Sequence, residues 1–365
     1  MTAQRFRASG VTRREALGSL LGAGAGLALA PAALTLDQEA AVPRGAVIRT
    51  LLQDISPDSL RGPVLFHEHL SIDLPPHLNP RPAGAPPAPP PQPSPTLNVD
   101  LIVDEVKAAA RDGVALIVDG GHPDMNRKID DLKAIAARTG MPIVASGGYY
   151  MERTYPRELA TQSEDQIAEA LTRETQAQRL GAFGEIGENA DAAMSDLERK
   201  IFRAVGKAHL ATNLPIFTHN AYGTGPNVPR DAGLRQLDVL ESVGVKPQRV
   251  AIGHSCCLDD PDADVIRAIA KRGAFVGFDR VTAGRVPDDK KIVMLLKFLD
   301  AGYADRLLLS SDLTGARTLE LPGYARTATI FAPKVRAAGV GADIVRRILV
   351  DNPRRFLAFV PSGTV

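Results

Sequence analysis

The stretch 64–73, VLFHEHLSID, ends a short apolar run with two histidines that flank a glutamate. Side chains alternate between the two faces of a strand, so His67 and His69 are expected to point to one face and Glu68 to the other. Two imidazoles that converge in this way are the beginning of a metal site, although paired histidines also occur on ordinary surfaces. Further ligands have to come from elsewhere in the chain.

Seven similar apolar runs follow, and segments with helical periodicity separate many of them. The runs are VALIVDGG (114–121), PIVASGGYY (142–150), AFGEIGE (182–188), PIFTHN (215–220), RVAIGHS (249–255), AFVGFDR (274–280) and RLLLSSDL (306–313). Helical patterns at 99–113, 127–140 and 262–273 each end in glycine, the usual helix stop. Apolar strands with helical crossovers between them predict a parallel sheet.

Eight strand–helix units between residues 45 and 362 predict a (β/α)8 TIM barrel whose site lies at the C-terminal rim of the strands. An open, doubly wound sheet is the alternative, but that fold usually has a Gly-rich phosphate loop after a strand, and this sequence has none there. The segment 46–62 is expected to form a small hairpin over the bottom of the barrel. The segment 341–359 is expected to form closing helices.

Residues 1–40 differ in composition from the rest of the chain. The stretch TRREALGSLLGAGAGLALAPAA (12–33) combines the paired arginines Arg13 and Arg14 with a Gly/Ala/Leu run that ends in small residues. This pattern predicts a twin-arginine signal peptide and export to the periplasm or the cell exterior. An uncleaved membrane anchor is the alternative, but the run is barely long enough to span a bilayer. No later stretch is apolar enough to do so.

A Pro-rich insertion interrupts the barrel pattern after the first strand. Residues 74–95, LPPHLNPRPAGAPPAPPPQPSP, are of low complexity and are predicted to be extended and unpaired. The insertion leaves the first strand on the side where barrel active sites lie, so it either arches over the site or is a tolerated surface loop. His77 within it is not expected to be a ligand.

The charge pattern and the cysteine content argue against a nucleic-acid-binding surface and against a disulfide-stabilised fold. The net charge of +1 comes from interspersed acidic and basic residues, which argues against a nucleic-acid surface. The only two cysteines, Cys256 and Cys257, are adjacent and cannot clip distant segments together, so no structural disulfide framework is expected. A catalytic pair of Cys256 with His254 is formally open, but His254 is better used as a metal ligand.

Metal-competent side chains follow the C-terminal ends of five predicted strands. They are His67, His69, Glu185, His219, His254 and Asp312. Because these strand ends share one rim of the barrel, four imidazoles and two carboxylates converge there. The set exceeds what one tetrahedral zinc requires and favours two divalent ions, with Glu185 as a bridge between them. Zinc suits these ligands, and manganese or cobalt would also accept them. Glu188 is the competitor for the bridge, but strand alternation directs it into the following loop.

The motifs HEHL, GEIG, THN, GHSCC and SSDL, in this order and spacing, resemble the phosphotriesterase family of the amidohydrolase superfamily. The resemblance runs from Val47 to NPRRFL (352–357) and covers nearly all of the mature chain. It implies a more buried ion held by His67, His69 and Asp312 and a more exposed ion held by His219 and His254. Many members bridge the two ions with a carbamylated lysine. Here Glu185 stands at that position, as in the branch of phosphotriesterase homology proteins, so the bridge requires no carbon dioxide.

The reaction that the resemblance implies is metal-assisted hydrolysis by a hydroxide shared between two cations. Asp312 is the expected catalytic residue, which takes up and returns the proton. A lactone or another carboxylic ester is the leading small-molecule substrate class, because related members are often lactonases. Phosphotriester hydrolysis is the alternative within the enzyme class, and a non-catalytic, metal-binding periplasmic protein is the alternative outside it. The resemblance also implies a homodimer.

Candidate substrate contacts come from loops that follow the strands. Tyr149, with its neighbour Tyr150, follows the third strand, and Arg280 follows the seventh, where lactonase-like members of the family also carry arginine. Each has a structural alternative, in which the tyrosines pack beneath loops and Arg280 pairs with Asp279 or another acid. His122, after the second strand, is expected either to lie behind the ligands or to face solvent.

Overall fold

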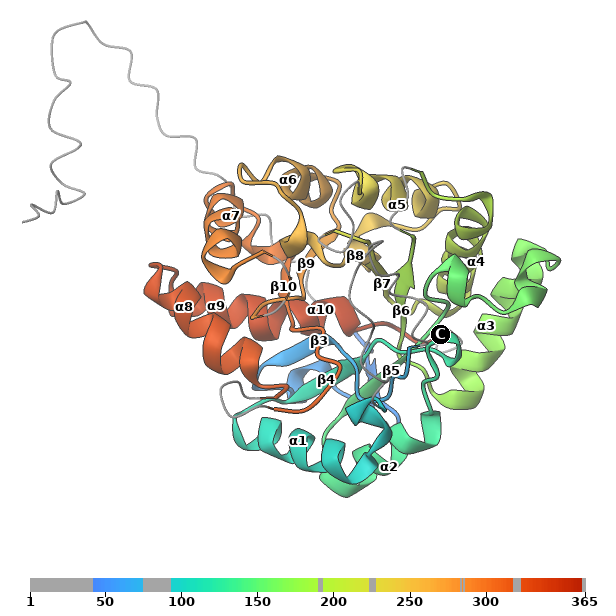
Figure 1. The fold of residues 1–365 in the computed structure, drawn as a ribbon, viewed down its shortest axis with the longest axis horizontal. Helices are drawn as coiled ribbons and strands as arrows, with labels where there is room; N and C mark the ends of the chain where they lie inside the picture. Colours follow the sequence, from blue (N-terminus) through green and yellow to red (C-terminus); the bar gives the residue numbers. More distant parts are fainter. Residues whose placement is uncertain are drawn as a thin grey trace, which may run out of the picture. The chain divides into compact units, whose positions relative to one another are not determined.

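Eight parallel strands lie side by side in chain order with helices around them, which is the predicted (β/α)8 barrel (Figure 1). The strands are β3 (Val64–Glu68), β4 (Leu116–Asp119), β5 (Ile143–Gly147), β6 (Ala182–Gly187), β7 (Ile216–His219), β8 (Val250–Ile252), β9 (Phe275–Phe278) and β10 (Leu307–Leu309). The surrounding helices are α1 (Val99–Arg111), α2 (Ile129–Thr139), α3 (Glu164–Gln178), α4 (Asp196–Thr212), α5 (Ala232–Glu241), α6 (Asp264–Lys271) and α7 (Asp288–Asp300). All eight strands form within the apolar runs expected from the sequence.

The structure is a computed structural model that describes residues 42–74, 93–189, 193–222, 228–282, 284, 286–317 and 323–362. The chain divides into two compact units, Met1–Ala40 and Ala41–Val365. The predicted signal peptide, residues 1–40, lies outside the described residues and stays a prediction. Within the described ranges no helix has the length and apolar character needed to cross a bilayer.

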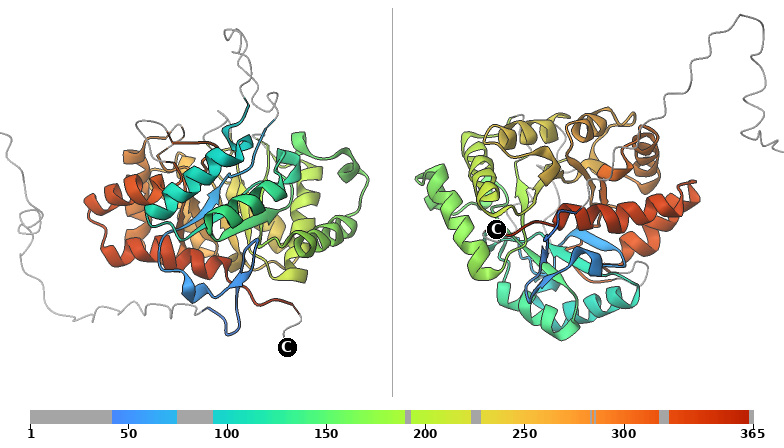
Figure 2. Two further views of the ribbon diagram at one scale, coloured as in Figure 1. Left: turned by 90° about the horizontal axis from the view of Figure 1, so that it is seen from below. Right: turned by 180° about the vertical axis from the view of Figure 1, so that it is seen from behind.

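The bottom of the barrel is closed by both ends of the described chain. Strands β1 (Ile48–Arg49) and β2 (Asp54–Ile55) form the predicted hairpin, and Leu51 N–H donates to the carbonyl of Ile143 at the start of β5, at 2.9 Å. Helices α8 (Ala332–Ala337), α9 (Ala342–Arg346) and α10 (Asn352–Leu357) follow β10. Val47 then pairs antiparallel with Phe359, which brings the hairpin and the C-terminal segment together (Figure 2).

Aromatic rings fill the interior of the barrel beneath the strand ends. Phe66 and Phe275 pack edge-to-face against Phe356 of α10, with centroids 6.5 and 5.4 Å apart, and Phe66 also packs edge-to-face against Phe217 at 6.3 Å. The smaller strand residues of this cluster are Val64, Leu116, Val118, Val144, Ala182, Ala251 and Leu308. The polar strand ends therefore have an apolar floor that excludes water from below.

Strand β3 departs from regular pairing at Phe66 and His67. Its pairing with β4 shifts register between Leu65 and Glu68. A bulge of this kind turns successive side chains toward one face. The rings of Phe66 and His67 accordingly both lie against Phe217 inside the barrel, with centroid distances of 6.3 and 5.2 Å.

Hydrogen bonds close the ring between the last strand and the first. The backbone N–H of Asp312 donates to the carbonyl of His67 at 3.2 Å, and that of His69 donates to the carbonyl of Leu313 at 3.0 Å. The N–H of His67 donates to Ser310 Oγ at 3.1 Å. These contacts place the chain after β10 directly beside the end of β3.

The two described ends of the Pro-rich insertion are joined. Residues 75–92 lie outside the described residues, so neither interpretation of this segment is tested. On its flanks, Thr96 Oγ1 accepts a hydrogen bond from the N–H of Ile72 at 2.9 Å and donates to the carbonyl of the same residue at 2.5 Å. The described flanks of the insertion are therefore held together by these two hydrogen bonds.

Strand β6 has a second bulge, which requires a glycine. Its pairing with β7 shifts register between Phe183 and Ile186, and Gly184 between them has a φ of +151°. A Cβ on Gly184 would lie 2.3 Å from the ring of Phe217, so no larger residue fits without displacing that ring. The close approach sets the path of the backbone that presents Glu185.

We expect Gly184→Ala to lower the free energy of unfolding by about 1–3 kcal/mol, because the added Cβ overpacks the ring of Phe217. Gly315→Ala is the matched control, since a Cβ there meets Pro95 at an ordinary contact distance of 3.6 Å. Urea unfolding of both variants measures the difference. An unchanged midpoint for Gly184→Ala would show that the ring gives way without penalty.

Candidate metal centre

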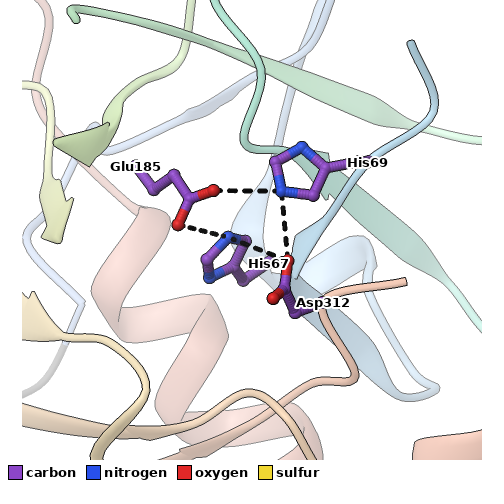
Figure 3. Close-up of side chains that lie close together, drawn as sticks. All are labelled: His67, His69, Glu185 and Asp312. Carbon is purple, nitrogen blue, oxygen red and sulfur yellow. Dashed lines mark ion pairs between the residues drawn. The ribbon is translucent and has the colours of Figure 1, made fainter. Parts of the chain in front are cut away.

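Four side chains from three strands surround one point at the C-terminal rim (Figure 3). His69 Nε2 lies 3.1 Å from Glu185 Oε1 and 3.1 Å from Asp312 Oδ1, and His67 Nε2 lies 3.3 Å from Glu185 Oε2. Each of the four offers one ligand atom, and these atoms all lie within 4.8 Å of one another. We call these residues, His67, His69, Glu185 and Asp312, the first ligand group.

A second ligand group, consisting of Glu185, His219 and His254, shares one member with the first. Glu185 Oε2 lies 2.9 Å from His219 Nδ1 and 3.3 Å from His254 Nε2. The two imidazole nitrogens lie 2.9 Å from each other. Oε1 faces His69, and Oε2 lies beside His67 of the first ligand group as well as His219 and His254 of the second, so one carboxylate contacts both groups, as a bridging ligand would.

The donor set fits divalent metal ions. All six residues belong to one group or the other, and their imidazole and carboxylate atoms are the ligands that zinc and neighbouring transition metals accept. His67 Nε2 is buried and has no hydrogen-bond partner among the described residues. A buried nitrogen aimed at two carboxylates is satisfied when a cation lies between them.

Electrostatics at the site favour a cation. Burial opposes the charged form of His67, but Glu185 and Asp279 outweigh it and raise the pKa of this imidazole well above its usual value. Burial likewise opposes the carboxylate of Glu185, but the surrounding histidines hold its pKa well below the usual range. The ionised acid therefore attracts positive charge, which protons supply to the imidazoles and which a metal ion would supply in their place.

Asp279, which sequence reasoning did not assign to the site, holds two histidines from behind. Its Oδ2 lies 2.9 Å from His67 Nδ1, and its Oδ1 accepts the backbone N–H of His254 at 2.6 Å and lies 3.1 Å from His254 Nδ1. With Nδ1 engaged in this way, Nε2 of each ring faces the ligand groups. The available signal was its position, one residue after β9 and on the same rim as the ligands.

Glu68 points away from its neighbouring histidines, as strand alternation predicts, and it binds the chain on both sides of Asp312. Its Oε1 accepts from Ser310 Oγ at 2.7 Å and from Ser311 N–H at 2.8 Å, and its Oε2 accepts from Leu313 N–H at 2.8 Å. Burial raises the pKa of Glu68 to about 7. This carboxylate therefore positions Asp312 next to the first strand.

Asp312 and Arg280 meet at the opening of the site. Arg280 Nε lies 3.3 Å from Asp312 Oδ2, so the guanidinium pairs with the candidate catalytic acid and not with Asp279. Both side chains keep some exposure, 25% for Arg280 and 13% for Asp312. They are thus the charged groups of the site that an incoming substrate can reach.

The two tyrosines after β5 point in different directions. The ring of Tyr149, the predicted substrate contact, packs edge-on against Tyr155 at 6.1 Å. The ring of Tyr150 packs edge-on against His219 at 4.7 Å. Burial, with Glu185 and Asp312 nearby, raises the pKa of Tyr150 well above its usual value. Tyr150 is therefore the tyrosine that borders the ligand groups.

Three other sequence candidates belong to neither ligand group. Glu188 follows β6 but is buried, and burial raises its pKa to about 8. His122 is fully buried, 3.4 Å from Asp124, so the solvent-facing alternative is wrong. Cys256 Sγ accepts the N–H of Arg280 at 3.4 Å, and burial raises the pKa of the Cys256 thiol well above its usual value, which argues against a nucleophilic role.

A (β/α)8 barrel with imidazoles and carboxylates gathered at its C-terminal rim defines a class of metal-dependent hydrolases. The chain belongs to the phosphotriesterase family, which matches residues 47–357. The resemblance drawn from its motifs is thereby confirmed.

Three relatives show the range of this family. The phosphotriesterase homology protein of Escherichia coli is 30% identical over 81% of this chain and 97% of its own length. Its crystal structure with phosphate in the active site matches with a TM-score of 0.70 at 29% identity and covers 82% of this chain and 99% of that one. An aryldialkylphosphatase of Saccharolobus solfataricus is 30% identical over 70% of this chain and 84% of its own length. An N-acetyltaurine hydrolase of Xenopus tropicalis is 25% identical over 86% of this chain and 98% of its own length.

We expect Glu68→Gln to lower the free energy of unfolding by about 1–3 kcal/mol, because the amide cannot accept all three hydrogen bonds. Displacement of Asp312 should also weaken metal binding by about 10–100-fold, which a competition titration with a chromogenic chelator measures. Glu105→Gln is the control: this buried carboxylate accepts from Arg317 and binds neither Asp312 nor its neighbours, so its loss should affect stability alone. Equal metal affinity in both variants would contradict a positioning role for Glu68.

The buried carboxyl of Glu188 makes the stability of the protein depend on pH. Burial raises its folded-state pKa to about 8 from an ordinary value of 4.5, so the folded protein binds this proton more tightly than the unfolded chain does. The corresponding stability is present below about pH 4.5 and is lost as the pH rises through 8. Wild type should therefore lose about 5 kcal/mol relative to Glu188→Gln across this range. Urea unfolding at several pH values tests this, and parallel pH profiles would refute it.

Proposed function

We propose that the protein is a metal-dependent hydrolase that opens lactones or cleaves other carboxylic esters. The observation that carries the proposal is the shared position of Glu185, whose carboxylate contacts the histidines of both ligand groups. A single carboxylate between two sets of imidazoles is the arrangement that two divalent ions require. Membership of the phosphotriesterase family supports hydrolysis as the reaction.

The residues would divide between two ions, zinc in the first instance, with manganese or cobalt as alternatives. His67, His69 and Asp312 would hold one ion, His219 and His254 would hold the other, and Glu185 would bind both. When bound, such ions polarise the oxygen of the scissile group and bring the pKa of water close to neutrality.

Asp312 is the residue that we assign to proton transfer. The nearby histidines outweigh burial and lower its pKa, so its carboxylate is ionised and can accept a proton from the attacking water. Its partial exposure beside Arg280 lets it return that proton to the leaving alkoxide. No cysteine or serine nucleophile is needed.

Arg280 and Tyr150 would orient the substrate. The guanidinium offers hydrogen bonds to an ester or lactone oxygen at the opening, and the buried phenol ring beside His219 supplies an apolar wall. A neutral carbonyl compound suits such a wall better than a highly charged one.

Phosphotriester hydrolysis is the second candidate, and the similarity to an aryldialkylphosphatase favours it. A metal-binding protein without turnover is the candidate outside the enzyme class. We further propose export by the twin-arginine route to the periplasm or exterior and assembly as a homodimer, both of which rest on the sequence patterns and the family resemblance.

The first experiment is a proton-release assay on a panel of small lactones and one aryl phosphotriester, with the zinc-loaded mature chain. Fast lactone opening that a chelator abolishes, together with a trace phosphotriester rate, is the expected result. The reverse order of rates would assign the protein to phosphotriesters. No turnover of either class, with metal bound, would overturn both assignments.

Glu185→Gln should abolish turnover and lower the affinity for metal at both ligand groups together, because an amide cannot bridge two cations as a carboxylate does. Metal content by mass spectrometry and rates from the proton-release assay measure the two effects. Glu188→Gln is the matched control on the same strand–loop segment and should retain metal and turnover. Full activity of Glu185→Gln would sink the bridging role.

A further inference from the structure

We propose that Lys291 is a positioning residue for Arg280, which it holds together with Cys256 so that the guanidinium stays at the opening of the candidate metal centre. The kinetic part of this inference rests on the proposed function, whereas its binding part does not.

Buried side chains hold the backbone of Arg280 on both sides. Its N–H donates to Cys256 Sγ at 3.4 Å, and its carbonyl accepts from Lys291 Nζ at 2.5 Å. Strand β9 ends at Phe278, and the neighbouring segment still pairs with the chain at Phe278 and Val281 through Ser310, but not at Arg280. The N–H and carbonyl of Arg280 bond to the two side chains instead, and these set the direction in which Arg280 reaches Asp312.

Lys291 has no exposed surface, which is unusual for an ammonium group that must be desolvated to be buried. It stands in the first turns of α7, with Asp288 Oδ1 at 3.7 Å to help balance its charge. An apolar side chain of similar length would fill this position without the desolvation penalty. The hydrogen bond that Lys291 donates to the carbonyl of Arg280 offsets part of this penalty.

The first turn of α7 also holds the loop beyond Arg280, and this offers a matched control. Asp288 Oδ1 accepts the N–H of Thr282 at 2.9 Å, and Asp288 Oδ2 pairs with Lys334 at 2.8 Å. Lys334 thus contacts the same acid as Lys291, but it is half-exposed, and within the described ranges it pairs with Asp288 and not with Arg280. Removing Lys334 should perturb the loop without releasing Arg280.

The direction of the guanidinium matters because its hydrogen bonds are planar and directional. A charge-assisted hydrogen bond from arginine to an anionic or partly anionic oxygen loses most of its strength when the donor plane turns away. Loss of the Lys291 contact lets the Arg280 peptide rotate. Binding of any oxyanion at the opening should weaken, while the ligand groups themselves stay in place.

The test uses the zinc-loaded protein, the variants Lys291→Met, Arg280→Met, the double variant and Lys334→Met, and two readouts. The first is the dissociation constant of inorganic phosphate by calorimetry, and the second is the split between KM and kcat for a hydrolysed lactone. We expect Arg280→Met to weaken phosphate binding by about tenfold or more and Lys291→Met by about three- to tenfold. The double variant should match Arg280→Met, and Lys334→Met should match wild type. In the kinetic readout KM should rise more than kcat falls.

Additive losses in the double variant would overturn the proposal, since they would mean that Lys291 does not act through Arg280. Unchanged phosphate affinity in a folded Lys291→Met variant, or in Arg280→Met, would overturn it as well. Cys256→Ala removes the other backbone contact and carries the same test if Lys291→Met does not fold. Phosphate binding needs no turnover. An absence of lactone hydrolysis would therefore count against the proposed function, and the phosphate affinities of the variants would still test the role of Lys291.

Discussion

The carboxylate of Glu68 joins the first and last strands of the barrel, and the candidate metal centre depends on that connection. Three hydrogen bonds bind it to the chain on both sides of Asp312. They add to the two backbone hydrogen bonds that Asp312 and Leu313 share with His67 and His69. The buried carboxylate of Glu68 therefore helps to hold Asp312 at a fixed distance from the histidines at the end of β3.

The carboxylates of this site have two different roles. Glu68 and Asp279 bind protein groups and set the orientation of the backbone and of the imidazole rings, whereas Glu185 and Asp312 face the space between the two ligand groups. The apolar floor of phenylalanine rings below removes water as a competing partner. Glu68 and Asp279 thus determine the positions of the ligand side chains, and the ligand side chains determine what binds.

The sequence allowed the barrel and the convergence of six polar residues to be predicted, because periodicity and strand polarity carry that information. The bulges could not be predicted, since register depends on the neighbouring strand, and the same limit hid the role of Asp279 behind two rings. Tyr149 and Tyr150 show a related limit. Adjacent loop residues face different ways, and the local backbone path alone decides which of them borders the site.

The joined ends of the Pro-rich insertion have a consequence for how this protein can change over evolution. Thr96 binds both backbone groups of Ile72 and so holds the two flanks of the insertion together. The entropic cost of closing a loop between two such positions grows only slowly with the number of residues in it. Residues between these two positions can then be gained, lost or exchanged with little effect on the stability of the barrel. The barrel should therefore tolerate insertions and deletions at this junction beside the first strand, because they leave the strands that carry the ligands unchanged.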